Sequence, residues 1–261
     1  MVQFVDVVKS AVPRGNVGNP PLVICLSNYV KQTVRKHYPL KDEDLATLFN
    51  AIDLRRFDPT TRSDTRPQTR QELNIKPDKV IALMVAQDFH RKGLREAILA
   101  LAKVKDEHQA LVVVGKGSAG PYRRQAITLG VDQQIIFAGA TDDIVPYYRA
   151  ADFFVLPTRH DPCSLAVLEA LAMGLPVIST KFNGATEIMT HGVDGFVLDD
   201  PANINALAAA MKNLMDPRRR MVMREACLGQ RSRLSFENHV GELLKLYQTA
   251  TARRLRGGPE A

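Results

Sequence analysis

Residues 161–175 read D-P-C-S-L-A-V-L-E-A-L-A-M-G-L, and a short apolar run at 153–156 precedes them. The run predicts a buried strand, Asp161 falls in the loop that follows, and Ser164 can cap a helix that begins there. Glu169 lies about one turn inside that helix, so two carboxylates eight positions apart flank its first backbone N–H groups. This spacing suits a ligand with an anionic centre and hydroxyls at both ends, which is the shape of a sugar nucleotide.

The same alternation of apolar run and amphipathic segment extends from residue 79 to a helix that begins near residue 202. Near-continuous apolar runs separated by single helices are typical of parallel strands that are buried on both faces. We therefore predict an α/β fold with a doubly wound, Rossmann-like parallel sheet, whose ligands bind beyond the carboxyl ends of the strands. The six predicted strands are 80–85, 110–114, 135–138, 153–156, 176–179 and 195–198.

The chain before residue 79 has a different pattern. A strand at 22–27, a helix at 28–38 and a short strand at 46–50 precede a polar stretch at 58–69 that is rich in Arg, Thr and Pro. We expect the first 21 residues to form a loop or a disordered arm. The predicted division of the chain is a partial first layer with its linker (1–57), a sheet domain (58–233), and a C-terminal helix with a basic tail (234–261).

Bulk composition describes an ordinary globular chain of 261 residues, 45% of them hydrophobic, which is enough for one core and an appendage. The sequence contains no run of about 18 apolar residues, the length needed to cross a membrane. The N-terminus lacks the pattern of a cleaved signal. Cys25, Cys163 and Cys227 are widely separated, without metal-ligand spacing, which indicates reduced thiols. We expect a cytoplasmic protein without a metal site or a catalytic cysteine.

The C-terminal segment combines an apolar stripe with arginine clusters. The net charge of +7 favours polyanions or anionic lipid in general. Because tryptophan is absent and few aromatics alternate with the charges, we expect no nucleic-acid partner. Solvated helix faces and a frayed tail explain most of the arginines. In the helix expected at 236–255, an apolar stripe favours docking on the core: Phe236, Val240, Leu243, Leu244 and Tyr247.

A basic pair follows the first strand of the predicted sheet. Arg91 and Lys92 occur in D-F-H-R-K-G-L, and Gly93 lets the backbone bend closely into the next helix. At the same sheet edge as Ser164, this pair would hold a diphosphate and offset its charge. An ordinary solvated loop is the alternative, which the two nearby carboxylates disfavour. Arg56, in the linker, is either a third phosphate-directed cation or a plain hinge salt bridge.

The two carboxylates have different predicted partners. Glu169 can accept hydrogen bonds from both ribose hydroxyls, and its apolar neighbours imply a partly covered side chain that needs a partner. Asp161 would hold hydroxyls of the sugar ring, although a simple turn residue before Pro162 explains it nearly as well. The ligand-binding set also includes the helix start and two backbone positions expected at a base edge: Cys163, Ser164, Leu165, Ile136 and Phe137.

Several loops give weaker signals. The segment G-K-G-S-A-G at 115–120 lacks the fingerprint of a phosphate loop, so we expect a tight strand-to-helix turn near the ligand. His90 adjoins the basic pair and is interpreted as a loop histidine. The turn after the strand at 176–179 is expected to face the same cleft with Asn183, Gly184 and Glu187.

The order of these motifs resembles a known family. F-N-A-I-D-L-R-R-F, V-A-Q-D-F-H-R-K-G, A-A-D-F-F-V-L-P-T, the D-x7-E pair and D-G-F-V occur in sequence between residues 22 and 217. Together they resemble retaining glycosyltransferases of the two-Rossmann-domain (GT-B) type, in the family-4-like group with an E-x7-E pair. Within that group the chain looks most similar to bacterial lipopolysaccharide core glucosyltransferases, of which it would be the C-terminal donor-binding half.

The resemblance implies which part of the donor each candidate residue would bind. Arg91, Lys92 and Arg56 would bind the diphosphate of a UDP-sugar donor, Glu169 the ribose and Asp161 the sugar. The catalytic set would be Asp161, Glu169, Arg91 and Lys92, with no cofactor and no metal. The acceptor would be a glycan or glycolipid, so that peripheral contact with the inner membrane, helped by the arginine-rich tail, is an option.

The chain departs from the family pattern at three points. Asp161 stands where glutamate is usual, which shortens the carboxylate by one methylene, and Gln87 stands where an arginine is common. The third departure is the short N-terminal part, which implies a missing acceptor domain, supplied in cis or by a partner. The remaining 1–57 would be the remnant of that acceptor domain.

Two functions follow from these observations. The first is the donor-binding part of a retaining, metal-independent hexosyltransferase that moves glucose from UDP-glucose onto a glycan or glycolipid. The alternative is a non-catalytic nucleotide-sugar-binding module that acts with a partner supplying the acceptor domain. An epimerase would need more acid/base groups, and a phosphorylase a cofactor lysine, that the sequence does not display.

Overall fold

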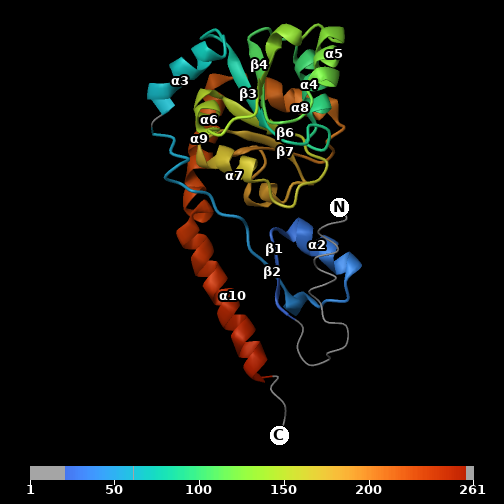
Figure 1. Cartoon of the computed structure of the whole chain (residues 1–261), viewed down its shortest axis with the longest axis vertical. Coiled ribbons are helices and arrows are strands. Elements are labelled where there is room, and N and C mark those ends of the chain that lie inside the picture. The colour runs from blue at the N-terminus through green and yellow to red at the C-terminus, as the bar shows by residue number, and fades with distance from the viewer. Residues whose placement is uncertain (1–20, 61, 257–261) are drawn as a thin grey trace.

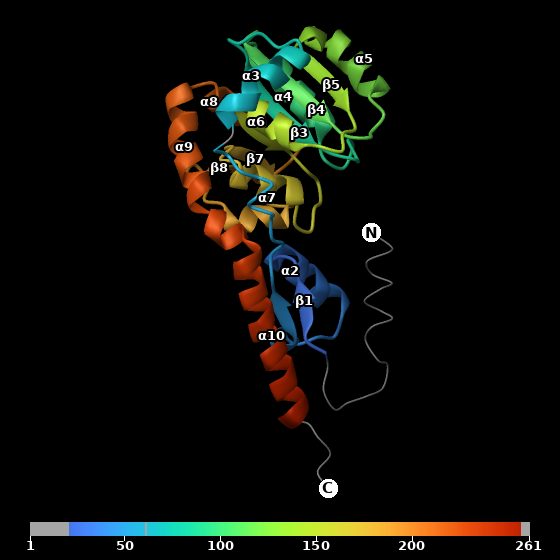
Figure 2. The same cartoon turned by 60° about the vertical axis from the view of Figure 1, so that its left-hand side comes forward.

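The structure is a computed structural model that describes residues 21–60 and 62–256. The arm predicted at 1–21 lies outside the described residues apart from Pro21, and residues 257–261 of the basic tail lie outside them too. Figures 1 and 2 show a larger body and a smaller body, connected by a linker and flanked by one long helix.

The larger body contains the six-stranded parallel sheet that the sequence predicts. Its spatial order is β5-β4-β3-β6-β7-β8. From β3 the chain moves outward to β5 and then returns to place β6 on the other side of β3, so the winding direction reverses between β3 and β6. The crevice beyond the carboxyl ends of these two strands is the topological switch point of the sheet, where ligands of such folds bind. The strands are β3 (Val80–Val85), β4 (Gln109–Val114), β5 (Ile135–Gly139), β6 (Phe153–Leu156), β7 (Val177–Thr180) and β8 (Gly195–Leu198).

Helices cover both faces of this sheet (Figure 1). On one face α4 packs beside α5 and α8, and on the other α3 packs beside α6 and α7 beside α9. Right-handed crossovers that reverse direction at β3 produce this two-sided arrangement. The helical elements are α3 (Arg62–Glu72), α4 (Leu94–Val104), α5 (Gly120–Thr128), η2 (Asp132–Gln134), α6 (Val145–Ala150), α7 (Leu165–Ala172), η3 (Gly184–Ile188), α8 (Ile204–Asn213) and α9 (Pro217–Gly229).

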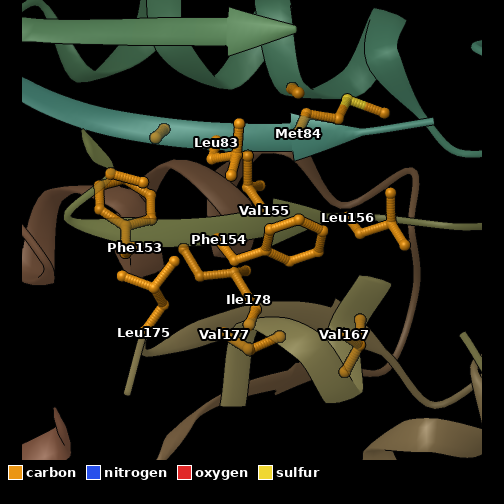
Figure 3. Packing of buried hydrophobic residues seen from close by; sticks show 14 of the residues in the cluster. Leu83, Met84, Phe153, Phe154, Val155, Leu156, Val167, Leu175, Val177 and Ile178 are labelled. Atoms are coloured by element: carbon orange, nitrogen blue, oxygen red, sulfur yellow. The ribbon is translucent and has the colours of Figure 1, made fainter. Parts of the chain in front are cut away.

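The core lies on both faces of the central strands (Figure 3). All of β6 is inaccessible to solvent, and its side chains pack against Leu83 of β3 and Ile178 of β7. A strand with helices on both faces needs an apolar residue at every position, which F-F-V-L supplies. Each fully buried large apolar side chain stabilises the fold by about 1.5–3 kcal/mol, so this core fixes the strand ends that carry the polar residues described below.

Helix α3 occupies part of the polar stretch at 58–69, for which the sequence predicted neither a helix nor a strand. Arg66 donates to the carbonyls of Ala150 (2.6 Å) and Ala151 (2.8 Å) at the end of α6, and it pairs with Asp152 at 2.6 Å. Arg70 of the next turn shares Asp152, at 3.3 Å. The helix is therefore held by tertiary contacts to α6 rather than by an apolar stripe, which explains why the local sequence pattern did not reveal it.

The smaller body consists of β1 (Val23–Cys25), α2 (Asn28–His37), η1 (Asp42–Asp44) and β2 (Leu45–Thr47). Its two strands pair in parallel, and Ser27 caps α2 by accepting from the N–H of Val30 at 3.2 Å. Glu187 of η3 accepts from the N–H groups of Asn28 (2.8 Å) and Tyr29 (2.6 Å). One carboxylate of the larger body thus anchors the first turn of α2, where unpaired N–H groups attract negative charge.

The linker between the bodies is fixed by the C-terminal segment. Arg231, in η4 (Arg231–Leu234), donates to the carbonyls of Phe57 (2.9 Å) and Leu54 (3.2 Å). His239, in α10 (Phe236–Arg256), hydrogen-bonds the carbonyl of Phe49 at 2.8 Å. The predicted domain boundaries at 57/58 and 233/234 stay predictions, because this tight association of linker and C-terminal helix does not test them.

The apolar stripe of α10 does not dock on the core, which corrects the expectation from sequence. Its exposed members, with their exposed fractions, are Phe236 (53%), Val240 (49%), Leu244 (56%) and Tyr247 (63%). The helix instead contacts the smaller body through polar groups, including an ion pair of Arg253 with Asp44 at 3.4 Å. Among the described helices, none has the length and apolar content required to span a bilayer.

Gly93 supplies a direct stability test. It begins α4 with φ of +82°, and a Cβ there would lie 2.2 Å from the carbonyl oxygen of Pro157. We expect Gly93→Ala to lower the free energy of unfolding by about 1–3 kcal/mol, measured by urea denaturation. Gly241→Ala in α10 is the matched control, because a Cβ there meets nothing within 4 Å; it should stabilise by about 0.5–1 kcal/mol. Equal stability of Gly93→Ala and the parent protein would contradict the close approach.

Candidate functional site

A cleft of about 480 Å³ opens at the switch point between β3 and β6. Its walls come from the loops that follow β3, β4, β5 and β6 and from the start of α7, with Asn50 of the linker at its edge. The volume lies in the range of small-molecule sites, roughly 300–1,000 Å³. Of the residues predicted from sequence, the cleft brings together Arg91, Lys92, Asp161, Cys163, Ser164, Leu165 and Glu169.

Arg91 is aimed by a tight turn after β3. Asp88 accepts from the backbone N–H of Arg91 at 2.9 Å and from its Nε at 3.3 Å, while the guanidinium donates to the carbonyl of His160 at 2.9 Å. The backbone hydrogen bond from Arg91 is the main reason that the pKa of Asp88 lies below its usual value. The turn therefore holds a fixed positive charge against the loop that carries Asp161.

Lys92 and Asp161 form an ion pair within the cleft. The side chains are 13% and 8% exposed, so the pair is mostly shielded from solvent. The backbone around Asp161 is fixed, because its N–H donates to the carbonyl of Phe182 at 2.9 Å and its carbonyl accepts from the N–H of Gly184 at 2.9 Å. The predicted basic pair and the predicted sugar carboxylate are thus in direct contact.

A second ion pair, between Arg159 and Glu96 of α4, also holds the loop after β6. Arg159 donates to Glu96 at 2.6 Å, and Glu96 is only 1% exposed within α4. The backbone N–H of Arg159 also donates to the carbonyl of Arg91 at 2.9 Å. These contacts tie the loop after β6 to the turn after β3, so the polar groups of the two loops keep one relative position.

The start of α7 differs in detail from the prediction. Ser164 occupies the N-cap position, but its hydroxyl makes no capping hydrogen bond. Its backbone N–H instead donates to Oδ1 of Asn183 at 3.2 Å. Asn183 is fully buried and supports the helix start, and Glu187 anchors α2; neither lines the cleft, contrary to expectation. Gly184 has a packing role, because a Cβ there would lie 2.2 Å from the hydroxyl of Ser27.

Glu169 lines the cleft and accepts a hydrogen bond from a buried tyrosine. The hydroxyl of Tyr148, which is fully buried, donates to its Oε2 at 2.8 Å. Burial raises the pKa of Glu169, while the hydrogen bond from Tyr148 and the charge of Arg56 act in the opposite direction. The sequence predicted a covered glutamate in need of a partner, and Tyr148 is that partner.

Three other predicted residues do not line the cleft. Arg56 is half exposed and lies 4.0 Å from Asp143, which matches the hinge salt bridge considered from sequence. Ile136 and Phe137 lie in β5, and the ring of Phe137 packs under the guanidinium of Arg123 at 4.7 Å, beside a separate small pocket. The loop after β5 reaches the cleft with Ala140 and Thr141 instead. A role of these three residues in ligand binding stays a prediction.

Lys116 is a cleft residue that the sequence analysis missed. It follows β4 directly, between Gly115 and Gly117. A Cβ on Gly115 would lie 1.6 Å from the carbonyl oxygen of Ala86, and one on Gly117 would lie 2.4 Å from the ring of Phe89. The two glycines therefore let the loop pack against the end of β3, which brings Lys116 to the wall of the cleft. A lysine between two glycines after a buried strand was the available signal.

The three cysteines, Cys25, Cys163 and Cys227, are free and buried. Cys163 lines the cleft but is 6% exposed, and burial raises its pKa to about 11. It is therefore protonated at neutral pH and unsuited to nucleophilic attack. His90 does not line the cleft. Within residues 21–60 and 62–256 no group of three or more His, Cys, Asp or Glu side chains has the arrangement of a metal site.

Comparisons with known proteins show a family for this chain. The family model described as "Glycosyl transferases group 1" matches residues 65–227. The chain is 26% identical over 234 residues to the uncharacterized glycosyltransferase MJ1607 of Methanocaldococcus jannaschii, covering 87% of this chain and 60% of that protein. It is 28% identical over 184 residues to the lipopolysaccharide glucosyltransferase WaaG of Escherichia coli, covering 69% and 49%.

A similar fold occurs among solved structures. The crystal structure of Anabaena Alr3699/HepE in complex with UDP and glucose has a TM-score of 0.74 to this chain at 21% identity, covering 87% of this chain and 63% of that one. The chain therefore spans about half to two thirds of the length of the proteins it matches.

The buried carboxylate of Glu169 gives a prediction on stability. Because its pKa is raised in the folded protein, the unfolded chain releases this proton first as the pH rises, and folding becomes less favourable. Glu169→Gln should therefore melt at a higher temperature than the parent protein at neutral pH. The difference should vanish below the ordinary carboxyl pKa of about 4.3 and level off above the raised value.

Thermal melts followed by circular dichroism across this pH range test the prediction. Glu107→Gln, at an exposed position, should leave the melting temperature unchanged at every pH. A lower melting temperature for Glu169→Gln at neutral pH would show that the ionised carboxylate stabilises the fold.

Proposed function

The chain belongs to the glycosyl transferases of group 1, and from this premise we propose that it is the donor-binding part of a retaining, metal-independent hexosyltransferase. The proposed reaction moves glucose from UDP-glucose onto a glycan or glycolipid such as the lipopolysaccharide core. Two of the similar proteins support this choice, since WaaG is a lipopolysaccharide glucosyltransferase and HepE was crystallised with UDP and glucose. The acceptor and the donor sugar of this chain are part of the proposal.

One observation carries the proposal: a single cleft is lined both by cations and by carboxylates, the two kinds of group that a sugar nucleotide would need. Arg91, Lys92 and Lys116 supply positive charge, while Asp161 and Glu169 lie on either side of the start of α7. A diphosphate at the start of α7 would meet both the backbone N–H groups and the cations. Glu169 would then accept from the ribose hydroxyls, and Asp161 from the hydroxyls of the hexose.

The same arrangement accounts for the chemistry of transfer. When the bond between the sugar and the diphosphate breaks, its electron pair passes to the phosphate oxygen, where negative charge develops. Fixed cations at that oxygen stabilise the transition state more than the ground state. The acceptor hydroxyl forms the new bond to the sugar and gives up its proton to the diphosphate oxygen that leaves. In this proposal Arg91 and Lys92 therefore serve as charge stabilisers, and no metal ion takes part.

The proposal also concerns where the acceptor would bind. The smaller body contributes two parallel strands within the described residues, and the similar proteins are longer than this chain. We propose that further sequence in cis, or a partner protein, supplies the acceptor domain. A glycolipid acceptor would place the protein at the cytoplasmic side of the inner membrane as a peripheral protein. The alternative, a non-catalytic nucleotide-sugar-binding module, uses the same cleft without transfer.

Calorimetry with UDP tests the donor site. Lys92→Ala should weaken UDP binding by about 1.5–3 kcal/mol, as for the loss of a charge-assisted hydrogen bond, which corresponds to roughly ten- to 150-fold in Kd. Lys181→Ala is the matched control, since Lys181 is exposed, outside the cleft, and paired with Asp199 at 3.2 Å. Equal UDP affinity of Lys92→Ala and the parent protein would contradict the proposal that the diphosphate binds at Lys92.

Excess EDTA tests the metal-independent mechanism. Binding of UDP-glucose by the parent protein should be unchanged, because side-chain and backbone groups supply all the positive charge in the proposal. Added Mg²⁺ should likewise leave the calorimetric Kd unchanged. A loss of binding in EDTA that Mg²⁺ restores would contradict the mechanism.

A further inference from the structure

The ion pair between Lys92 and Asp161 affects how the cleft can bind a diphosphate. Both side chains line the same cleft, and the lysine is the cation placed to meet a diphosphate. A phosphate oxygen that reaches Lys92 must share the ammonium group with Asp161 or take it away. Ligand binding at this position is therefore a competition between two anions for one cation.

Asp161 cannot leave the cleft when Lys92 does. Its backbone is hydrogen-bonded on both sides, to Phe182 and Gly184, and the next carbonyl, of Pro162, accepts from the hydroxyl of Ser27 at 2.6 Å. Lys92 instead has a flexible four-carbon side chain, and the next residue is Gly93. The lysine is the member of the pair that can turn, and the carboxylate is the member that stays.

Among the described residues, Lys92 is the cation that forms an ion pair with this carboxylate. The guanidinium of Arg91 is held by Asp88 and by the carbonyl of His160. Lys116 comes from the loop after β4, and no ion pair of Lys116 is found within the described residues. Once Lys92 turns to a phosphate, Asp161 is a mostly buried carboxylate that needs new hydrogen-bond donors.

A sugar nucleotide supplies those donors and a spent nucleotide does not. Hydroxyls of a hexose can donate to the carboxylate, whereas UDP alone brings only a second anion close to it. We propose that Asp161 competes with the diphosphate for Lys92, so that the site retains the sugar nucleotide and releases the nucleotide that remains after transfer. The role deepens the proposed function and rests on it.

The uncharged variant Asp161→Asn distinguishes competition for Lys92 from a role of Asp161 that is limited to contact with the sugar. Asparagine keeps the size of the side chain and loses its charge, so Lys92 becomes available to the diphosphate. We expect the Kd for UDP to fall roughly three- to tenfold, the scale of one charge interaction in a partly shielded site. The Kd for UDP-glucose should rise or stay constant, so the preference for the sugar nucleotide falls. A simple sugar contact predicts an unchanged Kd for UDP.

Two further variants keep the test decisive. Asp161→Glu retains the charge and should show no gain in UDP affinity, which distinguishes charge from altered packing. In the Lys92→Ala background, Asp161→Asn should improve UDP binding less than it does in the parent protein, because the contested cation is gone. An equal or larger improvement there would overturn the competition. Asp199→Asn, at a position outside the cleft, is the matched control and should change neither Kd.

The outcomes distinguish the two levels of the proposal. A parent protein that binds neither UDP nor UDP-glucose in calorimetry would overturn the proposed function and the competition with it. A parent protein that binds both, combined with unchanged or weaker UDP binding by Asp161→Asn, would overturn the competition alone. Circular dichroism melts of each variant establish that the compared proteins are folded.

Discussion

The contact between the turn after β3 and the loop after β6 fixes the basic pair of the cleft relative to Asp161. Gly93 approaches the carbonyl of Pro157 too closely for any side chain, and the carbonyl of Arg91 accepts from the N–H of Arg159 at 2.9 Å. The sheet order makes this contact possible, because β3 and β6 are neighbours although more than sixty residues separate them in sequence. The basic pair and Asp161 come together because two parallel strands end at the same edge.

Much of this arrangement could be predicted from the sequence, for a physical reason. Strands buried on both faces leave continuous apolar runs, and the residues that follow such runs must meet at one edge of the sheet. Arg91, Lys92, Asp161 and Glu169 were located in this way, and the family model agrees with the fold. The pairing of Lys92 with Asp161 could not be predicted, since it depends on side-chain conformation across two loops.

The features that the sequence did not reveal, or placed wrongly, share a cause as well. Helix α3 depends on Arg66 and Arg70 meeting carbonyls at the end of α6, a contact that no local pattern records. Asn183 and Glu187 are polar residues of a loop near the cleft, yet they satisfy backbone N–H groups of α7 and α2. A polar residue after a strand can serve a ligand or a neighbouring helix end, and only the three-dimensional arrangement separates the two uses.

The hydrogen bonds of Arg231 bear on the order in which the chain can acquire its structure. This side chain joins the linker at Leu54 and Phe57 to the end of α7 at Ala172. On a ribosome the linker emerges long before residue 231, so these three hydrogen bonds cannot form until Arg231 has been synthesised. The central sheet, whose strands all lie between residues 80 and 198, can form earlier. The hydrogen bonds of Arg231 are consequently added to the linker after all six strands of the sheet have been synthesised.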